Sequence, residues 1–277
     1  MYKEISNSKQ NERSLRNTSN KKNAGNKALD ENKLSDDVWI ILPGHNEEEQ
    51  LTPLLEEVSK IANNVVFVDD GSTDKTYDVA SSAGVVVLRH ITNLGKGGAL
   101  RTGCDYAVLK GAKKIIVMDS DGQHDPEEIS KFIEKLNSGF DVIVGCRKWN
   151  SSMPMMMRFG NYGLHKISSV MFNVDVKDTQ SGYRAFTSEA YRKIRWASND
   201  YSMESEMLAR LHKHNLNYST VDIKTIYHNT YKGTTVMNGI RIAYNMLLWK
   251  VFGLKDSEIE TSEISSFEQN TKNDIFL

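Results

Sequence analysis

Five short apolar runs, each followed by another element, constrain the fold of this chain more than any other feature. They cover residues 38–42, 65–68, 85–88, 115–118 and 141–145, and helical patterns follow the first four, at 51–62, 74–83, about 97–109 and 126–137. Strands that are apolar on both sides are typical of a parallel sheet with helices on both faces. The alternation therefore predicts an α/β fold, Rossmann-like, with a mainly parallel sheet.

The second half of the sequence is less regular, but its apolar spacing still indicates separate elements. Helices are expected at residues 155–172 and 203–214, with a turn and a short strand at 178–186 between them. A strand is expected at 218–226 and a last, amphipathic helix at 237–254.

The last helix carries two apolar stripes, of which only one can face the core. We assign the stripe that contains Tyr244 and Leu247 to the core. The second stripe contains Trp249 and is flanked by Arg241 and Lys250, a pattern that suits docking on a membrane surface. An ordinary packed helix or a homodimer contact is an equally good interpretation of this stripe, and a membrane-protein partner is left open.

The two ends of the chain differ in composition from the rest. Residues 1–37 are rich in Asn, Ser and Lys, and residues 255–277 carry an excess of acidic side chains. Such segments bury too little apolar surface to offset their ordering entropy, so we expect a disordered N-terminal arm and a disordered acidic tail. The folded domain is then expected at residues 38–236.

Composition also excludes several classes of protein. The net charge of −1 provides no basic field for nucleic acid. No apolar run reaches about 18 residues, so no transmembrane domain is expected. Cys104 and Cys146 form no metal-binding pattern, and two lone thiols are typical of a reduced, cytoplasmic interior.

Two carboxylates follow the fourth apolar run at once. Asp119 and Asp121 are two residues apart, so in an extended segment both point to the same side, with the amide oxygen of Gln123 close behind. Oxygen-only ligands of this kind suit Mg²⁺ or Mn²⁺. Ligands of open α/β sheets bind beyond the carboxyl ends of strands, which is where this pair lies. The alternative is a solvated turn after a core strand.

Polar loops follow each of the first four strands, and together they could line one cleft. Asp69 and Asp70 follow the second strand, where a carboxylate is well placed for a ribose hydroxyl or a base edge. Gly95–Gly98 opens a helix whose first N–H groups suit a phosphate, and Lys96 adds a positive charge there. Gly95–Gly98 could also be a simple tight turn.

These four loops resemble those of the family 2 glycosyltransferases of GT-A fold, and within that family the dolichyl- or polyprenyl-phosphate sugar synthases of mannose or glucose type. The resemblance spans about residues 38–235. Its main motifs are Pro43–Glu47 (PGHNE), Val68–Asp74 (VDDGSTD), Asn93–Ala99 (NLGKGGA) and Met118–Gln123 (MDSDGQ). Gly145–Arg147 and Asp178–Arg184 support the narrower assignment.

The resemblance implies roles for individual residues. A nucleotide-sugar pocket would be lined by Pro43, His45, Glu47, Val68, Asp69, Asp70, Lys96, Asp119 and Ser120. The metal ligands would be Asp119, Asp121 and Gln123, and the catalytic residues Asp121 and Arg147. The acceptor phosphate would be held by Arg147, Arg158, Arg184 and Lys232, although Arg184 is as well suited to bracing the turn at Asp178.

This chain departs from the family pattern in two places. Related synthases often carry an Arg and a Lys in the loop after the last strand, where only His228 or Lys232 could substitute here. Many relatives with sugar acceptors place a Glu-Asp pair near residue 203, where this chain has Glu204 and Glu206 at a different spacing. A lipid phosphate is already an anion and needs no base, whereas an attacking hydroxyl benefits from one. The second departure therefore favours a lipid phosphate acceptor.

The resulting hypothesis is a metal-dependent, inverting glycosyltransferase. It would move a hexosyl or N-acetylhexosaminyl group from a nucleotide-diphosphate sugar to a polyprenyl (dolichyl) phosphate, as a peripheral protein on the cytoplasmic face of a membrane. Two alternatives remain at this point: a family 2 enzyme that acts on a glycan or a protein, and a nucleotide-sugar binding module without turnover.

Overall fold

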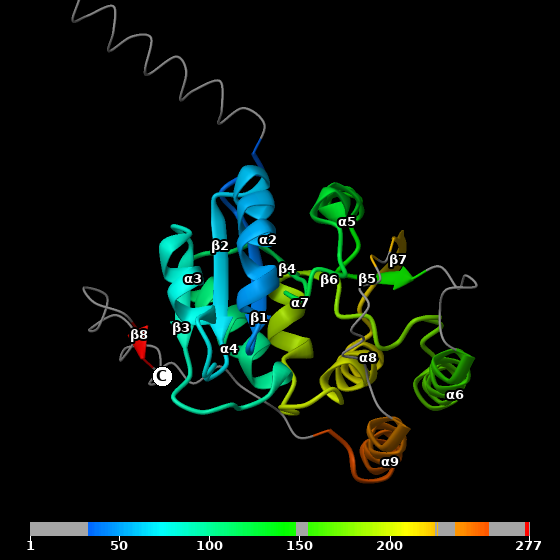
Figure 1. The fold of residues 1–277 in the computed structure, drawn as a ribbon. Helices are drawn as coiled ribbons and strands as arrows, with labels where there is room; N and C mark the ends of the chain where they lie inside the picture. The colour runs from blue at the N-terminus through cyan, green and yellow to red at the C-terminus, as the bar shows by residue number, and fades with distance from the viewer. Residues whose placement is uncertain (1–32, 148–154, 225, 227–235, 255–274, 277) are drawn as a thin grey trace, which may run out of the picture. The chain divides into compact units, whose positions relative to one another are not determined.

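A single mixed sheet organises the chain (Figure 1). The computed structural model describes residues 33–147, 155–224, 226, 236–254 and 275–276, and for 155–159, 236, 275 and 276 the backbone alone. The chain divides into two units, Met1–Ser35 and Asp36–Leu277, and all elements below belong to the second. The strands are β1 Val38–Gly44, β2 Asn64–Asp69, β3 Val86–Arg89, β4 Lys114–Val117, β5 Val142–Arg147, β6 Arg184–Thr187, β7 Tyr218–Ile223 and β8 Ile275–Phe276.

The strand order is β7-β5-β6-β4-β1-β2-β3-β8, with β1 near the centre and buried along its whole length. Strands β4, β1, β2 and β3 are parallel, and β5 is parallel to β7. Strand β6 lies antiparallel between β4 and β5. The expected α/β fold with a mainly parallel sheet is therefore confirmed.

Helices cover both faces of this sheet. They are α2 Glu48–Ile61, α3 Thr76–Ser82, α4 Lys96–Leu109, α5 Ile129–Asn137, α6 Met155–Phe172, α7 Ser188–Ile194, α8 Met203–Lys213 and α9 Val236–Phe252, with a short 3₁₀ turn at Pro126–Glu128. Helix α4 packs on the face formed by Ile41 and Val68, so closely that a side chain at Gly103 would meet both. Alternate residues of a strand point to opposite faces, so Ile40 and Leu42 are buried on the other face.

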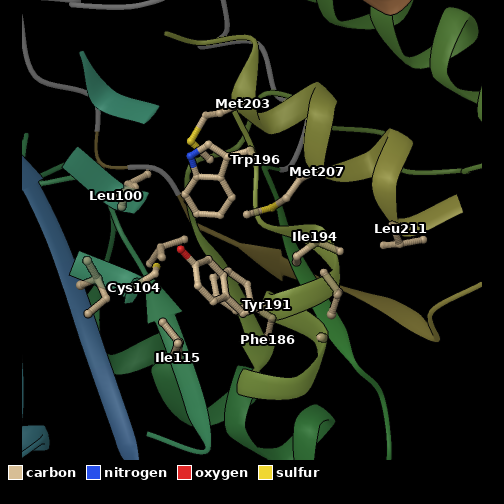
Figure 2. Close-up of a cluster of buried hydrophobic side chains, with 14 of the residues drawn as sticks. Leu100, Cys104, Ile115, Phe186, Tyr191, Ile194, Trp196, Met203, Met207 and Leu211 are labelled. Atoms are coloured by element: carbon tan, nitrogen blue, oxygen red, sulfur yellow. The ribbon is translucent and has the colours of Figure 1, made fainter. Parts of the chain in front are cut away.

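The core on the α4 face joins the two halves of the chain. Figure 2 shows Trp196 beside Met203 and Met207, with Tyr191 and Cys104 lying below it. The indole N–H of Trp196 donates to the carbonyl of Gly97, 2.8 Å away. The segment after α7 is thereby attached to the start of α4, and this attachment shapes the site described below.

Three features differ from the sequence-based expectations. The antiparallel insertion of β6 and the helix α7 were not expected, because both depend on how the 178–194 segment returns to the sheet. Ile275–Phe276 was expected to be disordered, yet it forms β8 beside β3. Two apolar residues can extend an open sheet edge through main-chain hydrogen bonds, which explains this pairing. The rest of the expected tail and nearly all of the expected N-terminal arm lie outside the described residues.

The assignment of the two faces of α9 was wrong. Ile242 and Met246, from the stripe expected to be exposed, are 1% and 0% exposed, and Trp249 packs against the same core. Tyr244 and Leu247, from the stripe assigned to the core, are 60% and 52% exposed. Periodicity shows that two stripes exist, but only the surface presented by the neighbouring α6 and α8 decides which one is buried. In the part of the chain that the structure describes, no helix has both the length and the apolar character needed to cross a membrane.

Candidate active site

A cavity of about 630 Å³, lined mostly by polar residues, opens at the carboxyl ends of β1, β2 and β4. This is the edge of an α/β sheet at which ligands bind, and the volume suits a nucleotide-sized molecule. Its lining comes mainly from four strand-end loops and one loop of the second half: Pro43, Gly44, His45, Asn46, Glu47, Asp70, Asn93, Gly95, Lys96, Ala99, Asp119, Ser120, Asp121, Asp200 and Tyr201.

A row of alternating charges extends from this cavity into the protein. The ammonium group of Lys96 lies 2.7 Å from Oδ1 of Asp119 and 2.9 Å from Oε1 of Glu204. Burial lowers the pKa of Lys96, but the two carboxylates more than offset this and raise it above its ordinary value. Burial raises the pKa of Asp119, and Lys96 together with His124 more than offsets this, so that the pKa of Asp119 is well below its usual range. Lys96 and Asp119 are therefore both charged at neutral pH.

Asp121 is less well compensated than Asp119. Oδ1 of Asp121 accepts a hydrogen bond from the backbone N–H of Gln123, at 3.0 Å. Burial and the neighbouring charge of Asp119 raise the pKa of Asp121 above its usual value. Asp119 and Asp121 are thus two nearby carboxylates, one of which resists ionisation. Such a pair fits a hard divalent cation, because the cation relieves the repulsion between the two carboxylates.

The expected metal set of two carboxylates and one amide is only partly brought together. Asp119 and Asp121 both line the cavity, whereas Gln123 is not among its lining residues. Among residues 33–147, 155–224, 226 and 236–254, no group of three or more His, Cys, Asp or Glu side chains is arranged around one point for a metal. A divalent ion held here would therefore rely on two protein carboxylates, with the substrate and water completing its shell.

Oδ2 of Asp119, the oxygen that is not paired with Lys96, lies in a narrow space. Nε2 of His124 is 3.5 Å from Oδ2 of Asp119, and the imidazole of His124 packs against the ring of Tyr183. A Cβ at Gly182 would collide with this same Oδ2 and would also lie only 2.6 Å from Oδ1, closer than real contacts allow. Neither His124 nor Gly182 was singled out for a role in the sequence, since no spacing rule connects them with Asp119.

The β1 end of the cavity is held by short hydrogen bonds. The Ser120 hydroxyl donates to the carbonyl of Pro43 at 2.6 Å, which ties the end of β4 to the end of β1. The imidazole of His45 is exposed toward the cavity, and its Nδ1 lies 2.9 Å from the carbonyl of Asp70. Pro43, His45, Glu47 and Ser120 thus all lie where a nucleotide pocket was expected.

Asp69 and Asp70, at the end of β2, differ in position and in their partners. Asp70 lines the cavity, and its carboxylate accepts hydrogen bonds from the N–H groups of Leu94 and Gly95 and contacts Nδ1 of His90 at 2.6 Å. Burial raises the pKa of Asp70, but these partners more than offset it and the pKa is lowered. Asp69 is absent from the lining and pairs with Arg89 at 3.0 Å.

Two residues expected in the pocket are therefore not brought to it. Val68 is fully buried in the core, and Asp69 is the last residue of β2, with its carboxylate accepting the N–H of Ser72 at 3.0 Å. Successive strand residues point in opposite directions, which places Asp70 at the cavity and its predecessor away from it.

The expected phosphate cradle at the start of α4 is also wrong in this structure. The N–H groups of Gly97 and Gly98 both donate to the carbonyl of Asn199, at 2.8 and 3.3 Å. A side chain at Gly95 or Gly97 would collide with the backbone at Asn199 or Ser198. The glycines thus allow a close approach by the chain itself, and the helix N-terminus is capped by protein instead of being open to a ligand.

The loop that caps α4 also completes the cavity, and sequence reasoning missed it. Glu206 accepts the N–H groups of Ala197 and Ser198, each at 2.9 Å, and is paired with Arg210. This brace supports the segment that follows, in which Asp200 and Tyr201 line the cavity. Because the loop has no glycine-rich or charged pattern, only its contacts with residues about 100 positions away reveal its importance.

Four basic residues were proposed to hold an acceptor phosphate, and the structure describes the side chains of two of them. Nε and Nη2 of Arg147 lie 2.6 and 2.9 Å from the carboxylate of Asp178, and Arg147 does not line the cavity. Arg184 is fully buried, and its guanidinium donates to the carbonyls of Thr179, Ser181 and Glu204. The interpretation of Arg184 as a phosphate ligand is therefore corrected in favour of its alternative role as a brace. The side chain of Arg158 and the whole of Lys232 lie outside the described residues.

Comparison with known proteins gives consistent results. The profile of glycosyl transferase family 2 matches residues 39–195. An uncharacterized protein of Methanocaldococcus jannaschii is 40% identical over 227 residues, 78% of this chain and 93% of that protein. The UDP-N-acetylglucosamine–dolichyl-phosphate N-acetylglucosaminyltransferase of Methanococcus voltae is 32% identical over 241 residues, 77% of this chain and 96% of that protein. Glucosyl-3-phosphoglycerate synthase of Mycobacterium tuberculosis, solved with Mn²⁺, UDP-glucose and phosphoglyceric acid, shares the fold with a TM-score of 0.60 at 18% identity, over 79% of this chain and 81% of that one.

Proposed function

The chain belongs to glycosyl transferase family 2, and on that premise we propose that it transfers a hexosyl or N-acetylhexosaminyl group from a nucleoside-diphosphate sugar to a polyprenyl phosphate such as dolichyl phosphate. The observation that carries the proposal is the placement of Asp119, Asp121 and Lys96 together in one cavity at the carboxyl end of the sheet. The acceptor is supported by relatives named for dolichyl-phosphate and polyprenol-phosphate transfer.

The cavity supplies different chemistry at its two ends. His45, Glu47 and Asp70 provide polar groups for the base and ribose of the donor. Asp119 and Asp121 would hold Mg²⁺ or Mn²⁺, and a bound ion of this kind offsets the negative charge that develops on a leaving diphosphate. Lys96 places a second positive charge beside them, in a partly buried site where charge interactions are stronger than in water.

The transfer is a direct displacement in this proposal. An oxygen of the acceptor phosphate forms the bond to the anomeric carbon while the bond from that carbon to the nucleoside diphosphate breaks, and the electron pair leaves with the diphosphate. The configuration at the anomeric carbon is inverted. The acceptor oxygen is already anionic, so the enzyme contributes positioning and charge stabilisation without a general base.

The first turn of α8 agrees with a mechanism that has no base. Glu204 is paired with Lys96, and Glu206 is engaged by the N–H of Ala197 and by Arg210. Neither carboxylate is available to take a proton from an attacking hydroxyl. A glycan or protein acceptor, the alternative within this family, would make such a base useful.

The acceptor proposal retains Arg147, together with Arg158 and Lys232, as the residues that approach the lipid phosphate. Arg147 would then be held in place by its ion pair with Asp178 and act on the phosphate as a fixed positive charge. A polyprenyl chain lies in a bilayer, so we further propose that the protein is peripheral on the cytoplasmic face of a membrane.

Helix α9 supplies the surface for this membrane contact. Its outward side carries large, mostly exposed apolar side chains at helical spacing: Met237, Ile240, Tyr244, Leu247 and Val251. The same helix reaches the mouth of the cavity, because Arg241 pairs with Asp200 at 3.1 Å and the side-chain amide of Asn245 donates to Ser202 at 2.9 Å. Docking of α9 would therefore bring the cavity close to the lipid headgroups.

The proposal is tested by supplying radiolabelled UDP- and GDP-sugars with dolichyl phosphate in detergent and following label into the organic phase. We expect label in the lipid fraction, and Asp121→Asn should lower the rate roughly a thousandfold. Asp78→Asn, an exposed carboxylate of α3, is the matched control and should behave like the wild-type protein. Label that enters only glycan or protein would point to the alternative acceptor class, and donor binding without any transfer would point to a binding module.

A further inference from the structure

Lys96 occupies a position between two carboxylates that differ in their surroundings. Its ammonium group is 2.7 Å from Asp119, whose side chain is 25% exposed, and 2.9 Å from Glu204, whose side chain is 1% exposed. Asp119 lines the cavity, whereas Glu204 lies behind it on the first turn of α8. The lysine therefore links a carboxylate that a ligand can reach with one that a ligand cannot.

Glu204 depends on this lysine. Among the described residues, its carboxylate has no hydrogen-bond partner apart from the ion pair with Lys96, although both of its oxygens are fully buried. Arg184 also lies near Glu204, but its guanidinium donates to main-chain carbonyls and makes no ion pair with this carboxylate among the described residues. A buried carboxylate without an ion-pair partner is strongly unfavourable, so the ion pair with Lys96 is expected to persist. Asp119 has other ways to be compensated, because it is partly open to the cavity and lies beside His124.

We propose that Glu204 is a positioning residue for Lys96: it retains the ammonium group at the cavity when a divalent cation takes over the Asp119 carboxylate. Without a ligand, Lys96 is itself the cation on Asp119. When Asp119 turns to a metal ion, Lys96 stays on Glu204 and remains beside the incoming diphosphate. This proposal rests on the proposed function, because it needs Asp119 and Asp121 to hold a metal.

A consequence is that Lys96 and a metal ion compete for Asp119 until a diphosphate is present. Two cations close to the same oxygen repel each other, so Lys96 weakens the binding of a free divalent ion. A bound diphosphate places negative charge close to both cations and so offsets the repulsion between them. Metal and nucleoside diphosphate should therefore bind with positive cooperativity.

The test measures Mn²⁺ binding in the absence of any sugar transfer, by electron paramagnetic resonance of the free ion. Lys96→Met should tighten the binding of Mn²⁺ alone by about tenfold, because it removes the competing cation. Glu204→Gln should weaken it by about tenfold, because Lys96 then has only Asp119 as a partner. Lys110→Met, an exposed lysine at the far end of α4, is the control and should leave binding unchanged.

The double variant Lys96→Met with Glu204→Gln distinguishes this role from a simple effect of charge. If Glu204 acts through Lys96, the glutamine substitution should change Mn²⁺ binding by less than about threefold once Lys96 is gone. An equal effect of Glu204→Gln with and without Lys96 would overturn the proposal, as would unchanged binding in Lys96→Met. If Lys96→Met alone does not fold, the double variant, in which neither member of this ion pair is charged, should still bind Mn²⁺ more tightly than Glu204→Gln.

The outcome for Asp121→Asn separates this proposal from the proposed function. If that substitution leaves Mn²⁺ binding unchanged, the metal site itself is wrong and both proposals fail. If it abolishes binding while Glu204→Gln has no effect, the metal site stands and only the role of Glu204 is refuted. Cooperativity is checked separately by repeating the titration with UDP and with GDP, and it should be reduced at least severalfold in Lys96→Met, which lacks the competing cation.

Discussion

Replacing Gly182 by alanine should reduce activity far more than stability. A Cβ at this position would lie 2.6 Å from Oδ1 and 2.7 Å from Cγ of Asp119. Ordinary contacts between such atoms are about 3.5 Å or longer, so the carboxylate has to move by about 1 Å. The carboxylate of Asp119 is the end of a side chain that borders the cavity, so it can move without unfolding the core.

The expected loss follows from the role of Asp119. A displacement of about 1 Å in a positioning group typically costs about 10²-fold in rate, which corresponds to about 2.7 kcal/mol of transition-state stabilisation. The assay is single-turnover transfer of labelled sugar to dolichyl phosphate, with thermal unfolding of the same samples measured in parallel. Mn²⁺ affinity should fall together with the rate, because the same carboxylate is displaced.

Gly163→Ala is the matched control for this substitution. No atom lies within 4 Å of a Cβ at Gly163, which is inside helix α6. Alanine there should leave the rate unchanged and stabilise the protein by about 0.4–1 kcal/mol, because it restricts the unfolded chain. A Gly182→Ala protein with a rate within about threefold of wild type would refute the reasoning, since the position of Asp119 would then not matter.

Three further predictions concern the brace, the outer face of α9 and a buried carboxylate. Arg184→Met leaves three buried carbonyls without their donor and should lower the free energy of unfolding in urea by about 3–5 kcal/mol; a loss below about 1 kcal/mol would contradict its assignment as a brace. Replacing Ile240 and Leu247 together by serine should reduce co-sedimentation of the protein with anionic lipid vesicles at least severalfold. The control is Ile91→Ser, which replaces an isoleucine that is 83% exposed and should not reduce co-sedimentation. Equal losses in the two proteins would argue against α9 as the docking surface. The lowered pKa of Asp70 means that its carboxylate stabilises the fold at neutral pH and loses this effect as pH falls through its folded pKa. The difference in the free energy of unfolding between wild type and Asp70→Asn should therefore become smaller below about pH 4. A difference that does not change with pH would refute this prediction.

Short-range patterns were sufficient to predict the first five strands and the principal carboxylates of the site. Each of the first five strands was expected near its observed place, because a buried strand and the loop after it are encoded by consecutive residues. Asp119 and Asp121 could be placed at the edge of the cavity for the same reason, since parallel strands end at one edge of a sheet.

Contacts between distant segments decided the rest, and no local pattern encodes them. Gly95–Gly98 has the composition of a phosphate loop, yet the carbonyl of Asn199, about 100 positions away, accepts the N–H groups of Gly97 and Gly98. Arg184 has the charge of a phosphate ligand, but the turn that folds around it uses its donors. The two stripes of α9 are alike in hydrophobicity, and the neighbouring helices select which one is buried.

The sequence by itself therefore determined the α/β sheet, the family and the carboxylates at the end of β4. The tertiary structure alone decided that Lys96 lies between Asp119 and Glu204, that the 197–201 loop closes the cavity, and which side of α9 faces outward. The physical reason is the range of the interactions involved. Backbone preference and burial period act over a few residues, whereas ion pairs and caps form between groups that only folding brings together.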